Sequence, residues 1–97
     1  MWYILQALQV VQVDEARWRR WFVDNAHQLV LARQEFLQHN TVVTTLFLGV
    51  PMSPNDNQAL FLSRVDGHAH IPGRAYHSYA DAMSGHLEVC AEVIATG

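Results

Sequence analysis

Residues 41–50 read TVVTTLFLGV, and this stretch indicates the fold more clearly than any other part of the chain. β-Branched side chains dominate its first half, and such side chains favour strands because they pack well on a pleated surface. Leu46, Phe47 and Leu48 follow without strict alternation, which predicts a central strand buried on both faces. Residues 51–57 have loop chemistry, and residues 59–65 then return as a hairpin partner that ends at Asp66-Gly67.

Downstream of this hairpin, residues 67–77 are predicted to form a loop with a short strand around residues 74–76. Ser78, with Asp81 three residues later, has the pattern of a capping box and predicts the start of a long helix. One continuous apolar face is expected to be buried on that helix: Tyr79, Met83, Leu87, Cys90 and Ile94. Gly85 costs about 1 kcal/mol relative to Ala inside a helix, and a close approach of the helix backbone to the sheet would explain its presence.

Upstream, residues 2–5 form an aromatic and β-branched run typical of a strand, and residues 10–13 either prolong it or form a second one. Asp14 is the expected N-cap of a first helix whose apolar face carries Trp18, Trp21 and Phe22. Outside, Glu15 with Arg19 and Arg20 with Asp24 have the spacing of ion pairs. Residues 26–37 leave two readings open, a continuation of the helix to about residue 38 and a separate strand.

Composition limits the class of protein. The chain has 97 residues, 51% of them hydrophobic, and a formal net charge of −3 at pH 7, so we expect one globular domain over residues 1–97. That charge is too weak for a DNA mimic and has the wrong sign for a general nucleic-acid binder. The absence of lysine excludes Schiff-base chemistry, and Cys90 alone makes neither a disulfide framework nor a CxxC metal site.

Nothing in the sequence predicts a targeting or membrane-spanning segment. The apolar run of residues 1–13 is interrupted by Gln6, Gln9 and Gln12, has no basic flank and is too short to cross a bilayer. We therefore expect a cytoplasmic protein without a membrane partner.

Three segments together resemble a widespread group of small phage and prophage proteins of unknown function. Residues 44–49, TTLFLG, are similar to that group's VSTVFLG strand, and residues 60–67, LFLSRVDG, are a looser match to its second strand. Residues 76–86, YHSYADAMSGH, are similar to its YSTWEEALAGHEEVV helix. Upstream, residues 33–36, RQEF, resemble an arginine-led strand of the group, which favours the strand reading there. The sequence departs from the group after Gly49, where a His-containing, glycine-rich loop is usual.

The resemblance implies a phage-encoded protein that acts in the host cytoplasm. The group has no established activity, and we expect no enzyme and no cofactor because the sequence carries no catalytic constellation. Small size, phage resemblance and missing catalytic motifs favour an accessory protein that binds a host protein, as an anti-defence inhibitor of the anti-CRISPR kind. The alternative is an oligomeric virion or assembly component.

Histidines provide a weaker, zinc-based hypothesis. His68 and His70 are two residues apart, a spacing that points both imidazoles to the same side of a strand. His77, Asp66 and Asp81 are the candidates for completing a tetrahedral site. Exposed histidines without a metal are more common, so zinc remains the less favoured reading. His86 is expected to be structural, packed at the boundary of helix and sheet with one ring nitrogen hydrogen-bonded. Cys90 is expected to be a small core residue.

Nucleic-acid binding is also disfavoured. Arg17, Arg19 and Arg20 alternate with Trp18 and Trp21, a pattern of charge and aromatic stacking that occurs in single-strand binders. The three arginines are expected to point in three different helical directions and so do not form one stripe. Nearby acids (Asp14, Glu15 and Asp24) neutralise them, and both tryptophans are more simply explained as core residues.

A partner surface is predicted from exposed polar and aromatic positions. Trp2 and Tyr3 give a terminal strand a large apolar surface. This surface is a homodimer edge, a recognition face or a cover over one end of the core. The remaining candidates lie in the two expected loops: Pro51, Met52, Asn55, His68, His70 and Arg74.

The expected fold is a single α+β domain, with a small antiparallel sheet of about four strands and two helices packed on one face. Its expected core is Ile4, Trp18, Phe22, Val43, Leu46, Leu48, Phe61, Met83, Leu87 and Ile94.

Overall fold

The computed structural model describes residues 2–26, 29–50, 59–67 and 71–96. In chain order its elements are β1 (Trp2–Gln6), β2 (Gln9–Val13), α1 (Glu15–Asp24), β3 (Val30–Phe36), the 3-10 turn η2 (Leu37–His39), β4 (Thr41–Phe47), β5 (Phe61–Asp66), β6 (Arg74–Tyr76) and α2 (Tyr79–Thr96). The larger sheet is antiparallel, with strand order β3-β4-β5-β6, and β1 and β2 form a separate hairpin. The α+β class and the four-stranded antiparallel sheet are therefore confirmed.

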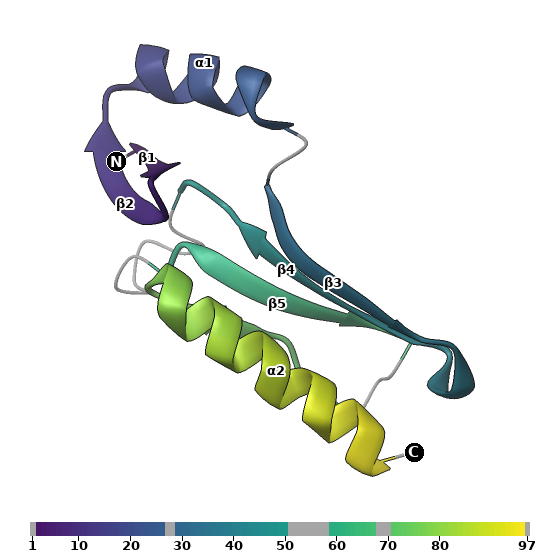
Figure 1. Cartoon of the computed structure of the whole chain (residues 1–97). Helices are drawn as coiled ribbons and strands as arrows, with labels where there is room; N and C mark the ends of the chain where they lie inside the picture. Colours follow the sequence, from purple (N-terminus) through teal and green to yellow (C-terminus); the bar gives the residue numbers. More distant parts are fainter. Residues whose placement is uncertain (1, 27–28, 51–58, 68–70, 97) are drawn as a thin grey trace.

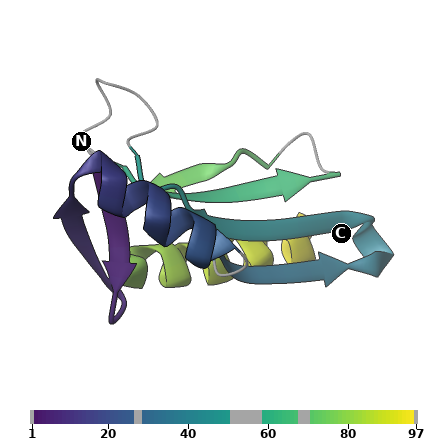
Figure 2. The ribbon, with the colours of Figure 1, turned by 90° about the horizontal axis from the view of Figure 1, so that it is seen from above.

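The two helices pack at different places along the molecule. α2 runs along one face of the four-stranded sheet, and α1 lies over the hairpin (Figure 1). Seen from above, the hairpin and α1 occupy one end and the β3–β4 turn occupies the other (Figure 2). α1 meets the sheet where β4 ends, because Trp21 and Phe22 place their rings against Phe47.

β4 shows how the sheet is buried. Thr41, Val43, Thr45 and Phe47 are buried on the face toward α2, whereas the alternate residues are half-buried. The expectation that this strand is buried on both faces, with Leu46 in the core, is therefore wrong, as is the core position of half-buried Leu48. One face of an antiparallel sheet commonly meets solvent, and here the charged pairs of β3 and β5 lie on that face.

The buried face of α2 also differs from the prediction. Ala82, His86, Val89 and Val93 are buried with Gly85, whereas Leu87 and Ile94 are 69% and 61% exposed. Both sets have helical spacing, so periodicity alone does not distinguish them. Small residues determine the outcome: a Cβ on Gly85 would overlap the ring of Tyr76, so the helix lies closer to the sheet on this face. The predicted close approach at Gly85 is thereby confirmed.

The ambiguous segment before β4 is a strand. α1 ends at Asp24 with Asn25 as C-cap, and β3 pairs with β4 from Val30 to Phe36. The residues between 26 and 37 have good helix propensity, but strand pairing along β4 outweighs that weak local preference.

Candidate functional site

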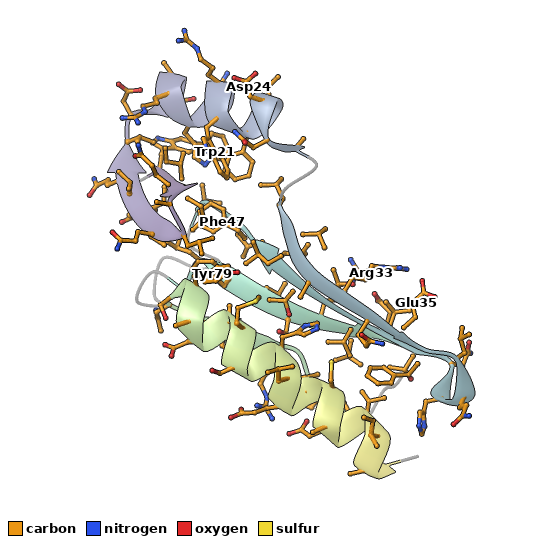
Figure 3. The ribbon with its side chains drawn as sticks, in the orientation of Figure 1. Trp21, Asp24, Arg33, Glu35, Phe47 and Tyr79 are labelled. Atoms are coloured by element: carbon orange, nitrogen blue, oxygen red, sulfur yellow. The ribbon has the colours of Figure 1, made fainter. Side chains whose placement is uncertain are left out.

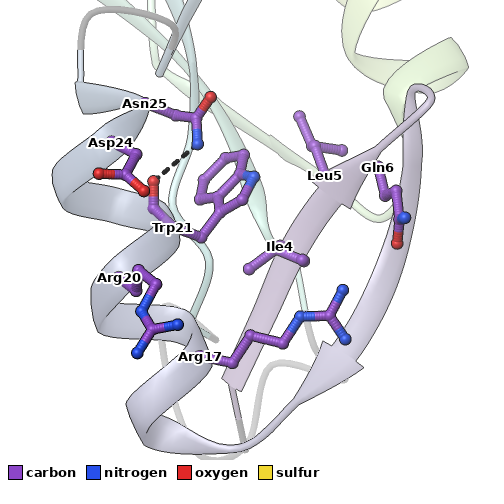
Figure 4. A pocket seen from close by; sticks show the side chains of 8 residues that line it. All are labelled: Ile4, Leu5, Gln6, Arg17, Arg20, Trp21, Asp24 and Asn25. Atoms are coloured by element: carbon purple, nitrogen blue, oxygen red, sulfur yellow. Dashed lines mark hydrogen bonds between the residues drawn. The ribbon is translucent and has the colours of Figure 1, made fainter.

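The main candidate site is a groove between α1 and β1, with a volume of about 260 Å³. Figure 4 shows that α1 forms one wall and the hairpin the other. We call it the α1 groove. Its lining residues are Ile4, Leu5, Gln6, Arg17, Arg20, Trp21, Asp24 and Asn25.

Local sequence positions the helical wall. The Asp14 side chain accepts a hydrogen bond of 2.8 Å from the backbone N–H of Arg17, which caps α1 as predicted. Asn25 ends the helix, because its backbone N–H and its side-chain amide both donate to the carbonyl of Trp21 (Figure 4). Trp18 packs against Trp2 with the two rings tilted by 47° and their centroids 4.4 Å apart, which holds the helix on the hairpin.

The floor of the groove is apolar. Ile4 is 3% exposed, and the half-buried indole of Trp21 packs edge-on against Phe47. A floor joined to the core in this way keeps its shape, which favours binding because little ordering remains to be done.

The charged rim of the groove is the feature that sets it apart. Four of the six arginines form ion pairs: Arg19 with Glu15, Arg33 with Glu35, Arg64 with Asp66, and Arg74 with Glu88 and Glu92. Arg17 and Arg20 have no ion pair with any described residue, and both line the α1 groove. The predicted Arg20–Asp24 pair is not formed between these described residues, and both side chains line the groove instead (Figure 4).

These groups together suit an acidic and apolar ligand. Guanidinium groups bind carboxylates through planar, charge-assisted hydrogen bonds. Arg17 and Arg20 are three residues apart and therefore share one side of α1. Asp24 lies further along the helix and disfavours an anion at that end. The groove can therefore hold one carboxylate near Arg17 with an apolar neighbour on Ile4 and Leu5.

A buried polar chain lies between the sheet and α2. The hydroxyl of Tyr76 donates to Ser63 Oγ at 3.0 Å, and Ser63 Oγ is 2.6 Å from Thr45 Oγ1. Thr45 Oγ1 lies 2.7 Å from His86 Nδ1, and Cys90 Sγ lies 3.6 Å from His86 Nε2. The predicted placement of His86, buried between helix and sheet with a hydrogen-bonded ring nitrogen, is confirmed.

The neighbouring Cys90 and His86 do not have the electrostatics of a nucleophile and its base. Burial raises the pKa of the Cys90 thiol and lowers the pKa of His86, so it favours the neutral form of both groups. An active thiolate needs the opposite, a lowered thiol pKa beside a cation. The chain of hydroxyls and imidazole therefore satisfies buried polar atoms across the helix–sheet interface.

The aromatic residues proposed for a partner surface lie largely inside the protein. Tyr3 is 6% exposed and belongs to the core cluster around Phe47, and its backbone N–H donates to Gly49 O at 2.9 Å. Trp2 is half-buried against Trp18. Of the readings left open, a covered end of the core describes these positions best.

The other predicted partner and metal residues are placed only in part. Arg74 reaches from β6 to α2, where it pairs with Glu88 and Glu92. Pro51, Met52, Asn55, His68 and His70 lie outside the described residues. His77 is exposed just before α2. Within the described ranges, no three residues of the metal-ligating types come together. No helix among them is long and apolar enough to cross a membrane.

Sequence reasoning did not single out the α1 groove. The signal that was available is the spacing of Arg17 and Arg20, which puts them on one side of a helix while Arg19 points elsewhere to Glu15. What the sequence does not contain is the position of β1 beneath that side.

Comparisons with protein-family models, with curated proteins and with solved structures give no match to this chain. The site is therefore interpreted from its own geometry.

Proposed function

We propose that this protein acts without catalysis, by binding another protein whose acidic side chain enters the α1 groove. The observation that carries the proposal is the coincidence of charge and shape: the two arginines without an acid partner among the described residues both line one groove with an apolar floor. Arginine beside a desolvated aromatic residue is a common composition of binding hot spots.

The biological setting of the proposal comes from the resemblance in sequence. A phage accessory protein in the host cytoplasm meets host proteins as its targets, and we propose a host defence component as the partner, bound in the manner of an anti-CRISPR inhibitor. Nucleic acid is a poorer occupant because Trp18 and Trp21 pack against other rings and the chain carries a net charge of −3.

A capture experiment with matched variants tests this function. Tagged protein is incubated with bacterial host lysate, washed with salt and analysed by mass spectrometry, in parallel with Arg17→Glu, Arg20→Glu and Arg19→Glu. Each substitution changes the charge of α1 equally, but Arg19 pairs with Glu15 outside the groove. We expect one host protein whose affinity falls about tenfold or more with the first two variants and is retained by the third.

Equal loss with all three variants would show non-specific charge attraction, and retention by all three would place the interface elsewhere. Either result would overturn the groove as the binding site. A folding control is needed, because α1 contributes to the core through Trp21 and Phe22. Unchanged urea midpoints of the three variants provide it.

The second candidate is an oligomeric virion or assembly component. The observation in its favour is the seven-residue β3 at one edge of the sheet, since an unpaired edge is a template for further strands. This function requires an oligomer, which light scattering at rising concentration would detect. A strictly monomeric species at high concentration would contradict it.

The zinc hypothesis for His68, His70 and His77 is a third and weaker proposal. Elemental analysis of tag-free protein should show stoichiometric zinc if it is correct. Zinc far below one ion per chain would eliminate it.

A further inference from the structure

β3 is an edge strand of the four-stranded sheet, and no other described strand pairs with its outer side. It has seven residues, whereas β6 at the opposite edge has three and is approached by α2, whose Glu88 and Glu92 pair with Arg74. Proteins usually shorten or cover an edge strand, because its unpaired N–H and C=O groups accept another strand. The length of β3 at an exposed edge therefore needs a physical explanation.

The hydrogen-bond pattern identifies which backbone groups of β3 point away from β4. One of them, the carbonyl of Glu35, accepts a long hydrogen bond of 3.5 Å from the side-chain amide of Gln34, which an incoming strand would replace. The N–H of Phe47 donates to Leu29 O at 2.9 Å, so the N–H groups of Phe47, Thr45 and Val43 point toward β3. Thr45 and Val43 are opposite Ala32 and Gln34 in the register. The intervening residues Arg33 and Glu35 therefore direct their backbone groups away from β4, to the outer edge.

We propose that this edge binds a second copy of the chain, with the two β3 strands antiparallel and related by a two-fold axis at Gln34. Hydrogen bonding between the outward groups allows a two-fold centre at Arg33, Gln34 or Glu35. A centre at Arg33 puts like charges opposite each other, and so does a centre at Glu35, which is destabilising. The centre at Gln34 pairs Arg33 of each copy with Glu35 of the other.

Charge complementarity is thus built into one register. Arg33 and Glu35 project together from β3 on the face away from α2 (Figure 3). Within one chain they are 2.5 Å apart, with about half of each side chain exposed. In the dimer each guanidinium lies between a carboxylate of its own strand and one of the partner strand, which makes an alternating network.

The opposite face of β3 supplies apolar contact in the same register. A centre at Gln34 places Ala32 opposite Phe36 of the second copy. Beside Phe36 a shallow cavity of about 370 Å³ is also lined by Leu37 and Ile94, which are 86% and 61% exposed. Leu87 lies on the same side of α2 as Ile94, since the two are seven residues apart, and is 69% exposed. A second copy at the β3 edge reduces the exposure of this apolar strip.

The inference stands independently of the α1 groove, because no residue of β3 lines that groove. Loss of the dimer leaves the groove proposal intact, and loss of groove binding leaves the dimer intact.

Analytical ultracentrifugation of the full chain tests the dimer. We expect a concentration-dependent species of twice the 11.0 kDa chain mass. Arg33→Glu should raise its dissociation constant about tenfold or more, because both inter-chain pairs become repulsive. The double variant Arg33→Glu/Glu35→Arg should restore it, since opposite charges again face each other.

Arg64→Glu is the matched control. Arg64 forms the same kind of exposed pair with Asp66, at 3.0 Å on the same face, but β5 is an interior strand. Arg64→Glu should leave the dissociation constant of the dimer unchanged. A monomer at all concentrations would overturn the proposal, and so would a dimer that is insensitive to Arg33→Glu or that the double variant fails to restore.

Cross-linking tests the register directly. In a Cys90→Ser background, Gln34→Cys places two thiols on the two-fold axis at a pair without backbone hydrogen bonds, where Cα atoms lie about 4.5 Å apart and a disulfide fits. Mild oxidation should give a covalent dimer, whereas exposed Gln12→Cys on β2 should remain monomeric. Equal cross-linking of both variants would overturn the register.

Discussion

Two adjacent residues of α2, Gly85 and His86, set how the helix lies on the sheet. Gly85 leaves room for the ring of Tyr76, and His86 bonds to Thr45 from the next position. The Tyr76 ring is itself held by the bond from its hydroxyl to Ser63. A change of size at Gly85 would move Tyr76, and a change of size at His86 would move Thr45. Both of these side chains also bond to Ser63.

Gly85→Ala is expected to destabilise the protein although alanine is the better helix former. The added methyl gains about 1 kcal/mol of helix propensity but overlaps a buried ring, and overpacking of a core costs about 1–3 kcal/mol. We expect a net loss of unfolding free energy in urea titrations. Ser84→Ala, one residue away on the exposed side, should be neutral or stabilising. Equal stability of both variants would show that Tyr76 moves aside freely.

His86 makes stability depend on pH. Burial lowers its pKa below the ordinary value of 6.5, so the unfolded chain binds a proton that the folded protein does not. The stabilisation from this residue is complete above pH 6.5 and is lost as the pH falls below it, with a slope of at most about 1.4 kcal/mol per pH unit. His86→Gln should be less stable at pH 8 but should lose less stability between pH 7 and pH 5. Parallel pH profiles of the two proteins would contradict this role.

At the scale of single elements, the β1–β2 hairpin has an unusual turn. Gln6 pairs with Gln9, so Ala7 and Leu8 form a two-residue connection with φ angles of 51° and 65°. Such turns usually contain Asn-Gly, because other residues lose about 1–2 kcal/mol each in the left-handed region. Asn40, the other non-glycine residue described with positive φ, has the expected residue type.

Replacing Ala7-Leu8 by Asn-Gly should therefore stabilise the hairpin. We expect the free energy of unfolding to rise by about 1–2 kcal/mol, and the exposed Leu8 side chain is removed at the same time. Asn40→Ala should have the opposite sign. Urea titrations of both variants provide the measurement, and a destabilised Asn-Gly variant would show that Leu8 makes a contact that outweighs its strain.

At the scale of the whole molecule, Phe47 joins the two sheets. Its ring centroid lies 5.2 Å from that of Phe61 on the sheet and 5.7 Å from that of Trp21 on α1. The surrounding core cluster includes Tyr3 of the hairpin and Ala82 of α2. One cluster thus connects elements from the whole length of the chain.

This connection leads us to expect a single unfolding transition, as the single-domain prediction requires. Phe47→Ala should cost about 3–5 kcal/mol, and hydrogen exchange should show equal loss of protection in β1 and in β5. Phe47→Leu is the milder variant if the first does not fold. Loss of protection confined to the hairpin would show that α1 and the hairpin form a separate unit.

Much of this molecule follows from local sequence. A β-branched run predicted β4, the apolar segment after the loop predicted β5 as its hairpin partner, capping residues predicted the starts of α1 and α2, and His86 was expected at the helix–sheet boundary. These predictions are correct because their physical causes, strand propensity and short-range hydrogen bonds, act within a few residues of the chain.

Three features depended on tertiary contacts. β3 is a strand because β4 offers it a partner, although its residues tolerate a helix. α2 buries Val89 and Val93 instead of Leu87 and Ile94, because Gly85 and Ala82 allow closer contact with the sheet. Arg17 and Arg20 border a groove because β1 lies beneath that side of α1. Periodicity shows that a helix has apolar faces, but the free energy of packing against residues distant in the chain selects which face is buried.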